Sequence, residues 1–88
     1  MAVRLDRAYG VDPQVAVRPE PFGALCYHYG NRRLTFLKSS DMVAVVRALD
    51  EHPTLGDALA ATGVPEDRWP AFLAALATLE SSEVIRAR

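Results

Sequence analysis

The sequence has few of the residues from which metal, nucleotide or disulfide sites are built. Its 88 residues include one cysteine, two histidines and five scattered glycines. A single cysteine excludes an internal disulfide and is typical of a reducing compartment. One cysteine and two histidines match no zinc-ligand spacing, and no glycine-rich phosphate loop is present. The composition therefore predicts a protein that holds no metal and no cofactor.

Long apolar runs and an excess of one charge are also missing. No apolar run approaches the ~20 residues of a membrane helix, and residues 1–12 mix charged with apolar side chains, so we expect no signal peptide. The formal net charge of −1 predicts no bulk attraction to nucleic acid or membrane. Half of the residues are apolar, which favours a folded globule. We expect one cytoplasmic domain over residues 1–88 with a thin core.

The sequence is organised around the stretch Ala24–Lys38, in which two alternating apolar runs flank Gly30-Asn31. Such a dipeptide predicts a two-residue hairpin turn, with Tyr27 opposite Leu34. Successive side chains of a strand point to opposite faces. One face then carries the larger apolar side chains: Leu25, Tyr27, Leu34 and Phe36. The other face carries Cys26, His28, Arg33 and Thr35. We expect the first face to pack on the core and the second to be largely polar.

The segments around this hairpin predict one more strand and three helices. Gln14–Arg18 alternates like a short strand, and residues 1–12 are expected to form a partly mobile N-terminal arm. Ser39 or Ser40 caps a first helix that ends at His52-Pro53, and Thr54 caps a second that ends at Gly63. A third helix runs from a cap at Asp67 to Ser81-Ser82, followed by a short extended tail. These elements predict an α+β fold, a small winged helix-turn-helix-like domain with a three-stranded antiparallel sheet followed by three helices.

Neither catalysis nor DNA binding is favoured by these elements. Cys26 and His28 point to the same side of a strand, but residues two apart lie ~7 Å from each other, beyond hydrogen-bond reach. We interpret them as a small strand residue beside a surface histidine, and we predict no catalytic residue and no enzyme. After Arg68 and Trp69, the third helix has no hydrogen-bonding side chain until Thr78. A recognition helix needs such side chains, so a DNA-binding regulator remains only an alternative, as does a purely structural adaptor.

Peptide binding is favoured by the second hairpin strand, Arg33–Lys38. If one of its backbone edges is free, the unpaired N–H and C=O groups can accept a strand from a partner. Cations at Arg32, Arg33 and Lys38 suit an acidic peptide, and a row of small side chains on the third helix lets another backbone come close. Strand addition predicts that Leu37→Pro blocks peptide binding. The same cations can instead protect the edge from aggregation, and the residues alone leave both interpretations open.

One longer stretch resembles a known family. Arg18–Ser39 reads RPEPFGALCYHYGNRRLTFLKS and continues into MVAVVRALDEHP. This pattern resembles the small precursor-binding chaperones of mycofactocin biosynthesis, which are PqqD-like recognition elements for ribosomally made, modified peptides. The resemblance extends roughly from Tyr9 to Ile85. Cys26 departs from it, since an ordinary apolar residue is expected there.

The resemblance implies a winged helix-turn-helix-like fold that binds a precursor's leader as an added strand, beside the third helix. It implies as partners a precursor peptide and a radical S-adenosylmethionine (SAM) maturase, with no nucleic acid, no membrane and no cofactor of its own. The peptide-binding residues that it implies here are Arg32, Arg33, Leu34, Thr35, Phe36, Leu37, Lys38, Phe72, Ala75, Leu76 and Leu79.

Overall fold

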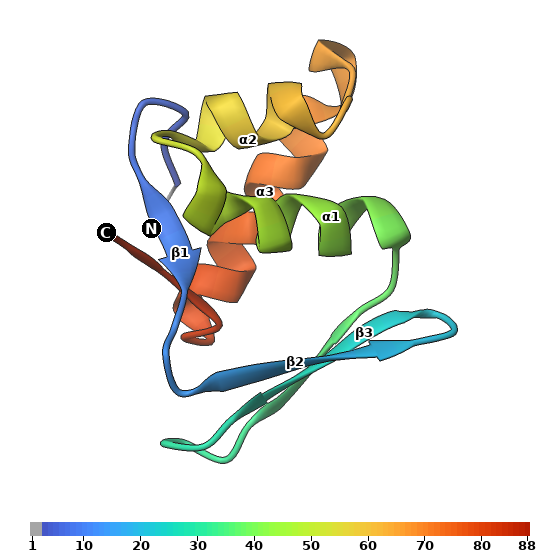
Figure 1. Cartoon of the computed structure of the whole chain (residues 1–88), viewed down its shortest axis with the longest axis vertical. Coiled ribbons are helices and arrows are strands. Elements are labelled where there is room, and N and C mark those ends of the chain that lie inside the picture. Colours follow the sequence, from blue (N-terminus) through green and yellow to red (C-terminus); the bar gives the residue numbers. More distant parts are fainter. Residues whose placement is uncertain (1–2) are drawn as a thin grey trace.

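A computed structural model describes residues 3–88. Three helices cover one side of an antiparallel sheet, and none of these described residues covers its other side (Figure 1). The strands are β1 (Tyr9–Val11), β2 (Val15–Glu20), β3 (Gly23–His28), β4 (Leu34–Leu37) and β5 (Ile85–Ala87). The helices are α1 (Ser40–Ala48), α2 (Leu55–Ala61) and α3 (Trp69–Ser81), with 3₁₀ turns at Leu49–Glu51 and Glu66–Arg68. The predicted α+β class, a three-stranded sheet followed by three helices, is confirmed.

Two of the predicted helix caps are confirmed. Ser39 Oγ accepts a hydrogen bond from the Met42 N–H (3.0 Å), and Thr54 Oγ1 accepts one from the Asp57 N–H (3.1 Å). Each bond satisfies a backbone donor that the first turn of the helix leaves free. Gly63 follows α2 with a φ of 78°, a conformation that costs glycine little.

The predicted cap of the third helix is wrong. Asp67 lies inside the 3₁₀ turn Glu66–Arg68, which the Arg68 N–H closes by donating to the Pro65 carbonyl (2.9 Å). Helix α3 therefore begins one residue later than predicted, at Trp69, with Arg68 at its cap position. Pro70 occupies its first turn, where the missing N–H has no helical acceptor in any case.

A second, two-stranded sheet joins the two ends of the described chain. Strand β1 pairs with β5 in antiparallel fashion, with Gly10 opposite Arg86 (Figure 1). Residues 9–11 of the expected arm are thus a strand, and the expected extended tail is its partner; residues 1–2 of the arm lie outside the described residues. Arg88 fixes this end of the molecule, because its guanidinium donates to the Tyr9 and Leu49 carbonyls (2.8 and 3.1 Å).

The hairpin register is confirmed, but the predicted turn is wrong. Tyr27 lies opposite Leu34 and Leu25 opposite Phe36. The loop is longer than two residues, since the Arg32 N–H donates to the His28 carbonyl (2.7 Å) and Arg32 has a φ of 61°. Gly30 does not adopt the positive φ that a tight Asn-Gly-type turn requires.

The two faces of the hairpin are the reverse of the prediction. The side chains that pack against the helices are Ala24, Cys26, His28 and Leu37, all buried. Leu34 and Phe36 are 57% and 55% exposed, on the uncovered side of the sheet. The small Ala24 and Cys26 let the sheet approach Val45 and Val46 of α1 in a single core cluster. The polar His28 is accepted in that layer because its ring is hydrogen-bonded.

No helix in residues 3–88 is long and apolar enough to cross a membrane.

Candidate functional site between strand β4 and helix α3

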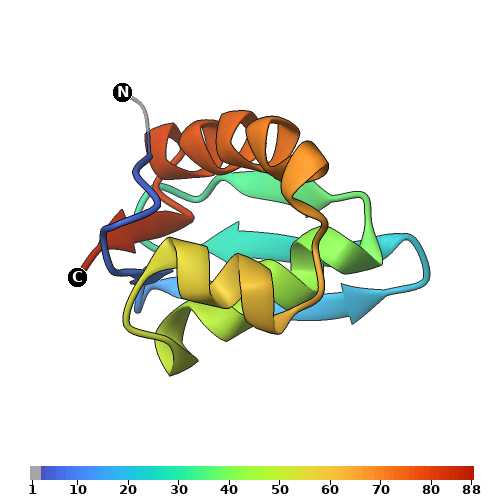
Figure 2. The ribbon, with the colours of Figure 1, turned by 90° about the horizontal axis from the view of Figure 1, so that it is seen from above.

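An open groove of about 470 Å³ is lined by residues of β4, of α3 and of the start of α1; Figure 2 shows α3 and β4 as neighbours in the view from above. Its β4 wall continues past the strand into the cap of α1. Six of the predicted binding residues line it: Thr35, Phe36, Leu37, Lys38, Ala75 and Leu79. The lining is mostly apolar and contains one charged side chain, Lys38. The groove therefore offers a mostly apolar surface that contains one cation.

The groove also contains three residues that the sequence did not single out as binding residues, Ser39, Met42 and Thr78. The sequence assigned both Ser39 and Met42 only to the first helix. Ser39 was a candidate cap, and Met42 was one of the apolar residues of that helix. Both come into the groove because α1 begins immediately after β4. Thr78 belongs to the row of small side chains predicted on the third helix. That row was the sequence signal from which Thr78 could have been identified as a groove residue.

Five other predicted binding residues do not line the groove. Phe72 and Leu76 are buried in the core beneath it. Arg32 and Arg33 belong to the hairpin loop, and the Leu34 side chain lies on the uncovered face of the sheet. Phe72 and Leu76 can thus shape the groove only from below.

Strand β4 is an edge strand with one side unpaired in the described chain, because the sheet order is β2-β3-β4. The His28 N–H donates to the Arg33 carbonyl (3.0 Å), which sets the hydrogen-bonding phase of the β3–β4 ladder. Since that phase alternates along an antiparallel pair, the backbone groups of Thr35 and Leu37 face β3. Those of Leu34 and Phe36 face away from the sheet. The free edge thus offers two N–H donors and two C=O acceptors.

Because of this hydrogen-bonding phase, Leu37 is not the position at which proline tests strand addition. A Cβ added to Gly23, which has a φ of 147°, would collide with the Leu37 carbonyl oxygen, so this carbonyl also faces β3. Leu37 is buried as well. Proline at position 37 would therefore remove a bond inside the sheet, and Phe36 is the position whose N–H is free for a partner strand.

Small side chains of α3 form the opposite wall. Ala71, Ala74 and Thr78 are exposed and Ala75 is half-buried. The Thr78 hydroxyl donates to the Ala74 carbonyl (3.3 Å), which turns its polar atom back onto the helix. Methyl groups therefore dominate this surface, and an added backbone can approach it closely.

Arg68, at the start of α3, is not free to bind an anion. Its guanidinium pairs with Asp41 (3.2 Å) and lies 5.2 Å from the centre of the Phe72 ring. The ion pair ties the start of α3 to α1, and the ring contact stays within α3. Helix α3 thus lacks the free cation that DNA binding by this helix requires.

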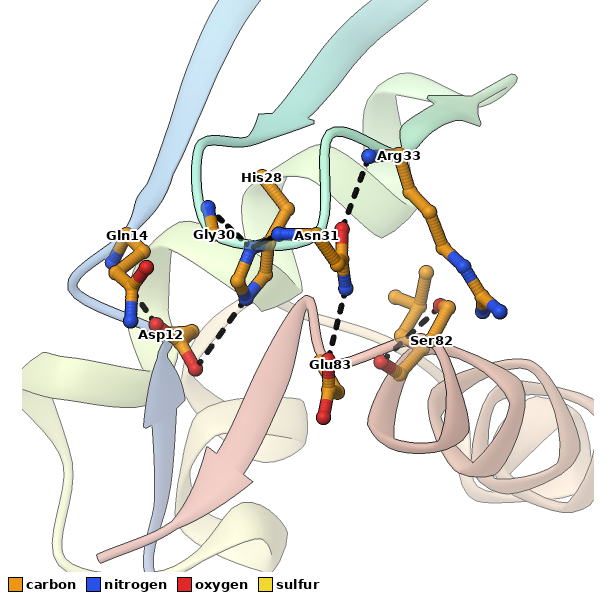
Figure 3. Close-up of polar contacts among 9 residues, drawn as sticks. Asp12, Gln14, His28, Gly30, Asn31, Arg33, Ser82 and Glu83 are labelled. Atoms are coloured by element: carbon orange, nitrogen blue, oxygen red, sulfur yellow. Dashed lines mark hydrogen bonds and ion pairs between the residues drawn. The ribbon is translucent and has the colours of Figure 1, made fainter.

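A polar cluster holds the hairpin loop at the start of β4, next to Leu34 (Figure 3). His28 Nδ1 accepts hydrogen bonds from the Gly30 and Asn31 N–H groups (3.0 and 3.1 Å). The remaining ring proton is therefore on Nε2, 3.7 Å from an Asp12 carboxylate oxygen. Asn31 also accepts from the Arg33 N–H (2.9 Å) and donates to Glu83 (2.8 Å). These bonds fix the point at which β4 leaves the loop.

The interpretation of His28 as a surface histidine is wrong, because it is 5% exposed and organises the loop. Cys26 is buried in the same layer, and desolvation raises the pKa of its thiol. A buried thiol with a raised pKa is a poor nucleophile. Within residues 3–88, no three His, Cys, Asp or Glu side chains are placed to hold a metal ion.

The comparison with known proteins decides the family. The model of the peptide chaperone MftB family matches residues 8–86. The chain belongs to this family. Three proteins named peptide chaperone MftB are similar to it over 80 residues, or 91% of the chain. Those of Mycobacterium ulcerans and Mycolicibacterium smegmatis are 48% identical, with 73% and 78% of their lengths covered. That of Mycobacterium tuberculosis is 45% identical, with 73% covered.

No solved structure matches the chain significantly. The names of the MftB relatives describe a chaperone of peptides, which is a non-enzymatic role. The expectation of a binding protein without enzyme activity agrees with these names.

Proposed function

We propose that this member of the MftB family binds the leader of the mycofactocin precursor peptide and presents the peptide to a radical SAM maturase. The leader adds as a strand to β4 and lies in the groove against α3. One observation carries this proposal: the free backbone edge at Leu34 and Phe36 opens beside a groove walled by small side chains. Strand addition uses such an edge for affinity and the neighbouring pockets for selection.

The free edge alone gives too little affinity. Four backbone hydrogen bonds contribute about 2–6 kcal/mol net, whereas a micromolar complex needs about 8 kcal/mol. Burial of apolar peptide side chains against Met42, Ala75 and Leu79 supplies the difference, at about 25 cal/mol per Å². The groove therefore selects a peptide with apolar residues on one face of its strand.

The function is tested by titrating the chain with the synthetic precursor peptide and, separately, with duplex DNA. We expect saturable heat in calorimetry with the peptide and no gel shift with the DNA, because α3 offers no free cation in its described surface. A DNA shift without peptide binding would replace this function with that of a regulator.

Charge removal at the groove separates Lys38 from the two arginines of the loop. We expect Lys38→Gln to weaken peptide binding about three- to fivefold at low salt and less at high salt, because salt screens an exposed pair. Lys38 lines the groove, and Arg32 and Arg33 do not. Calorimetry at two salt concentrations checks this, with Arg86→Gln on β5 as a remote control. An equal loss in both salts would mean that Lys38 makes no electrostatic contact.

A further inference from the structure

The uncovered side of the β2-β3-β4 sheet is apolar. Five large apolar side chains are exposed in residues 3–88, and four of them lie on this side: Phe22 (45%), Tyr29 (63%), Leu34 (57%) and Phe36 (55%). The register joins them through the half-buried Tyr27, opposite Leu34, and Leu25, opposite Phe36. Ring contacts extend the row at both ends, Phe22 to Phe36 (5.8 Å) and Tyr27 to Tyr29 (5.1 Å). We call these six residues the outer apolar face.

Of the charges around the outer apolar face, the one without an ion-pair partner in residues 3–88 is positive. Arg18 lies opposite Leu25 on the same side of the sheet, and Lys38 lines a hollow of about 360 Å³ together with Phe22 and Phe36. The three strands contain one acid, Glu20, and it pairs with Arg18 (3.0 Å). The face is thus an apolar surface bordered by the Arg18–Glu20 ion pair and by the cation Lys38.

This charge pattern decides among the possible occupants. A second copy, face to face, would offer Lys38 no unpaired acid from these strands, because their one acid, Glu20, already pairs with Arg18. Lipid-binding surfaces use clusters of about 4–8 basic residues, whereas this border has Arg18 and Lys38. A folded protein whose apolar patch is bordered by acids complements both features.

We propose that the outer apolar face docks a partner protein with an acid-bordered apolar patch, and that this partner is the radical SAM maturase. The identity of the partner rests on the proposed function. Phe36 and Lys38 line both the groove and the outer hollow, so the two surfaces meet along β4. A maturase docked on the outer face therefore lies next to a peptide in the groove. One small domain then holds substrate and enzyme on two sides of the same strand.

The test measures two bindings on three variants by calorimetry, with purified maturase and with synthetic precursor peptide. Tyr27→Asp places an acid at the centre of the outer apolar face. Arg18→Glu reverses an exposed charge on β2, and this substitution leaves the core unchanged. We expect each to weaken maturase binding about tenfold or more and to leave peptide binding within about twofold. Ala75→Arg, which fills the groove, is expected to do the opposite.

Four outcomes are informative. Unchanged maturase binding in both outer-face variants would overturn the proposal. A dimer that forms with rising concentration in light scattering, and that both variants dissociate, would also overturn it. Binding to phosphatidylserine–phosphatidylcholine vesicles in a sedimentation assay, if both variants abolish it, would do the same. If Ala75→Arg keeps full peptide affinity, the proposed groove fails while the docking surface stands, because the maturase titration does not use the peptide.

Discussion

A chain with Phe36→Pro is expected to bind the precursor peptide about tenfold or more weakly than a chain with Phe36→Ala. Both substitutions remove the ring, but only proline removes the N–H that faces away from β3. A peptide carbonyl then loses its donor at the centre of the added strand, which costs about 1–3 kcal/mol. Calorimetric titration of both variants isolates this single backbone donor.

Position 36 permits a clean comparison because β4 is an edge strand, where proline is tolerated. Thermal unfolding followed by circular dichroism is the control, and the two variants should melt within a few degrees of each other. Equal peptide affinity of Phe36→Pro and Phe36→Ala, with both chains folded, would exclude a hydrogen bond from this donor to the peptide.

His28→Ala is expected to lower the free energy of unfolding by about 2–4 kcal/mol. The substitution empties a buried ring position and leaves the Gly30 and Asn31 N–H groups without their acceptor. The hairpin loop then loses the contact that links it to the core, and the start of β4 loosens. Urea unfolding followed by circular dichroism measures the loss.

His28→Asn is the matched variant, because its side-chain oxygen can accept where Nδ1 does. We expect it to recover part of the lost stability. Asp12→Asn should cost little, since the Asp12 carboxylate is 3.7 Å from the ring. If Asn and Ala at position 28 destabilise equally, ring packing alone, without the Nδ1 acceptor, accounts for the effect.

Local patterns in the sequence were sufficient for the three-stranded sheet, the three helices and the hairpin register. Ser39 and Thr54 are caps whose partners lie three residues away, so nothing distant can change them. The register followed from the position of the loop, and it survived the wrong turn type because the longer loop is centred on the same residues.

The sequence could not assign the two faces of the hairpin. Leu25, Tyr27, Leu34 and Phe36 are larger and more apolar than Ala24, Cys26 and His28, and hydrophobicity alone therefore selected the wrong face. The helices of this chain pack on the smaller side chains, and a polar histidine is buried there because the loop supplies its hydrogen bonds. The apolar residues that this leaves outside form the outer apolar face.

Contacts between residues that are far apart in the sequence could not be predicted. Strands β1 and β5 have three residues each and lie at opposite ends of the chain, so no local pattern announced their pairing. Six of the predicted binding residues line the groove, but Ser39 and Met42 enter it only because α1 begins directly after β4.

Strand addition to β4 is tested most directly by amide hydrogen exchange, read residue by residue by nuclear magnetic resonance with and without the precursor peptide. In the free chain, the amides of Thr35 and Leu37 should exchange slowly and those of Leu34 and Phe36 fast, because only the first two face β3. Saturating peptide should slow Leu34 and Phe36 by about tenfold or more. If these two amides exchange equally fast in the saturated complex, the peptide does not add to β4.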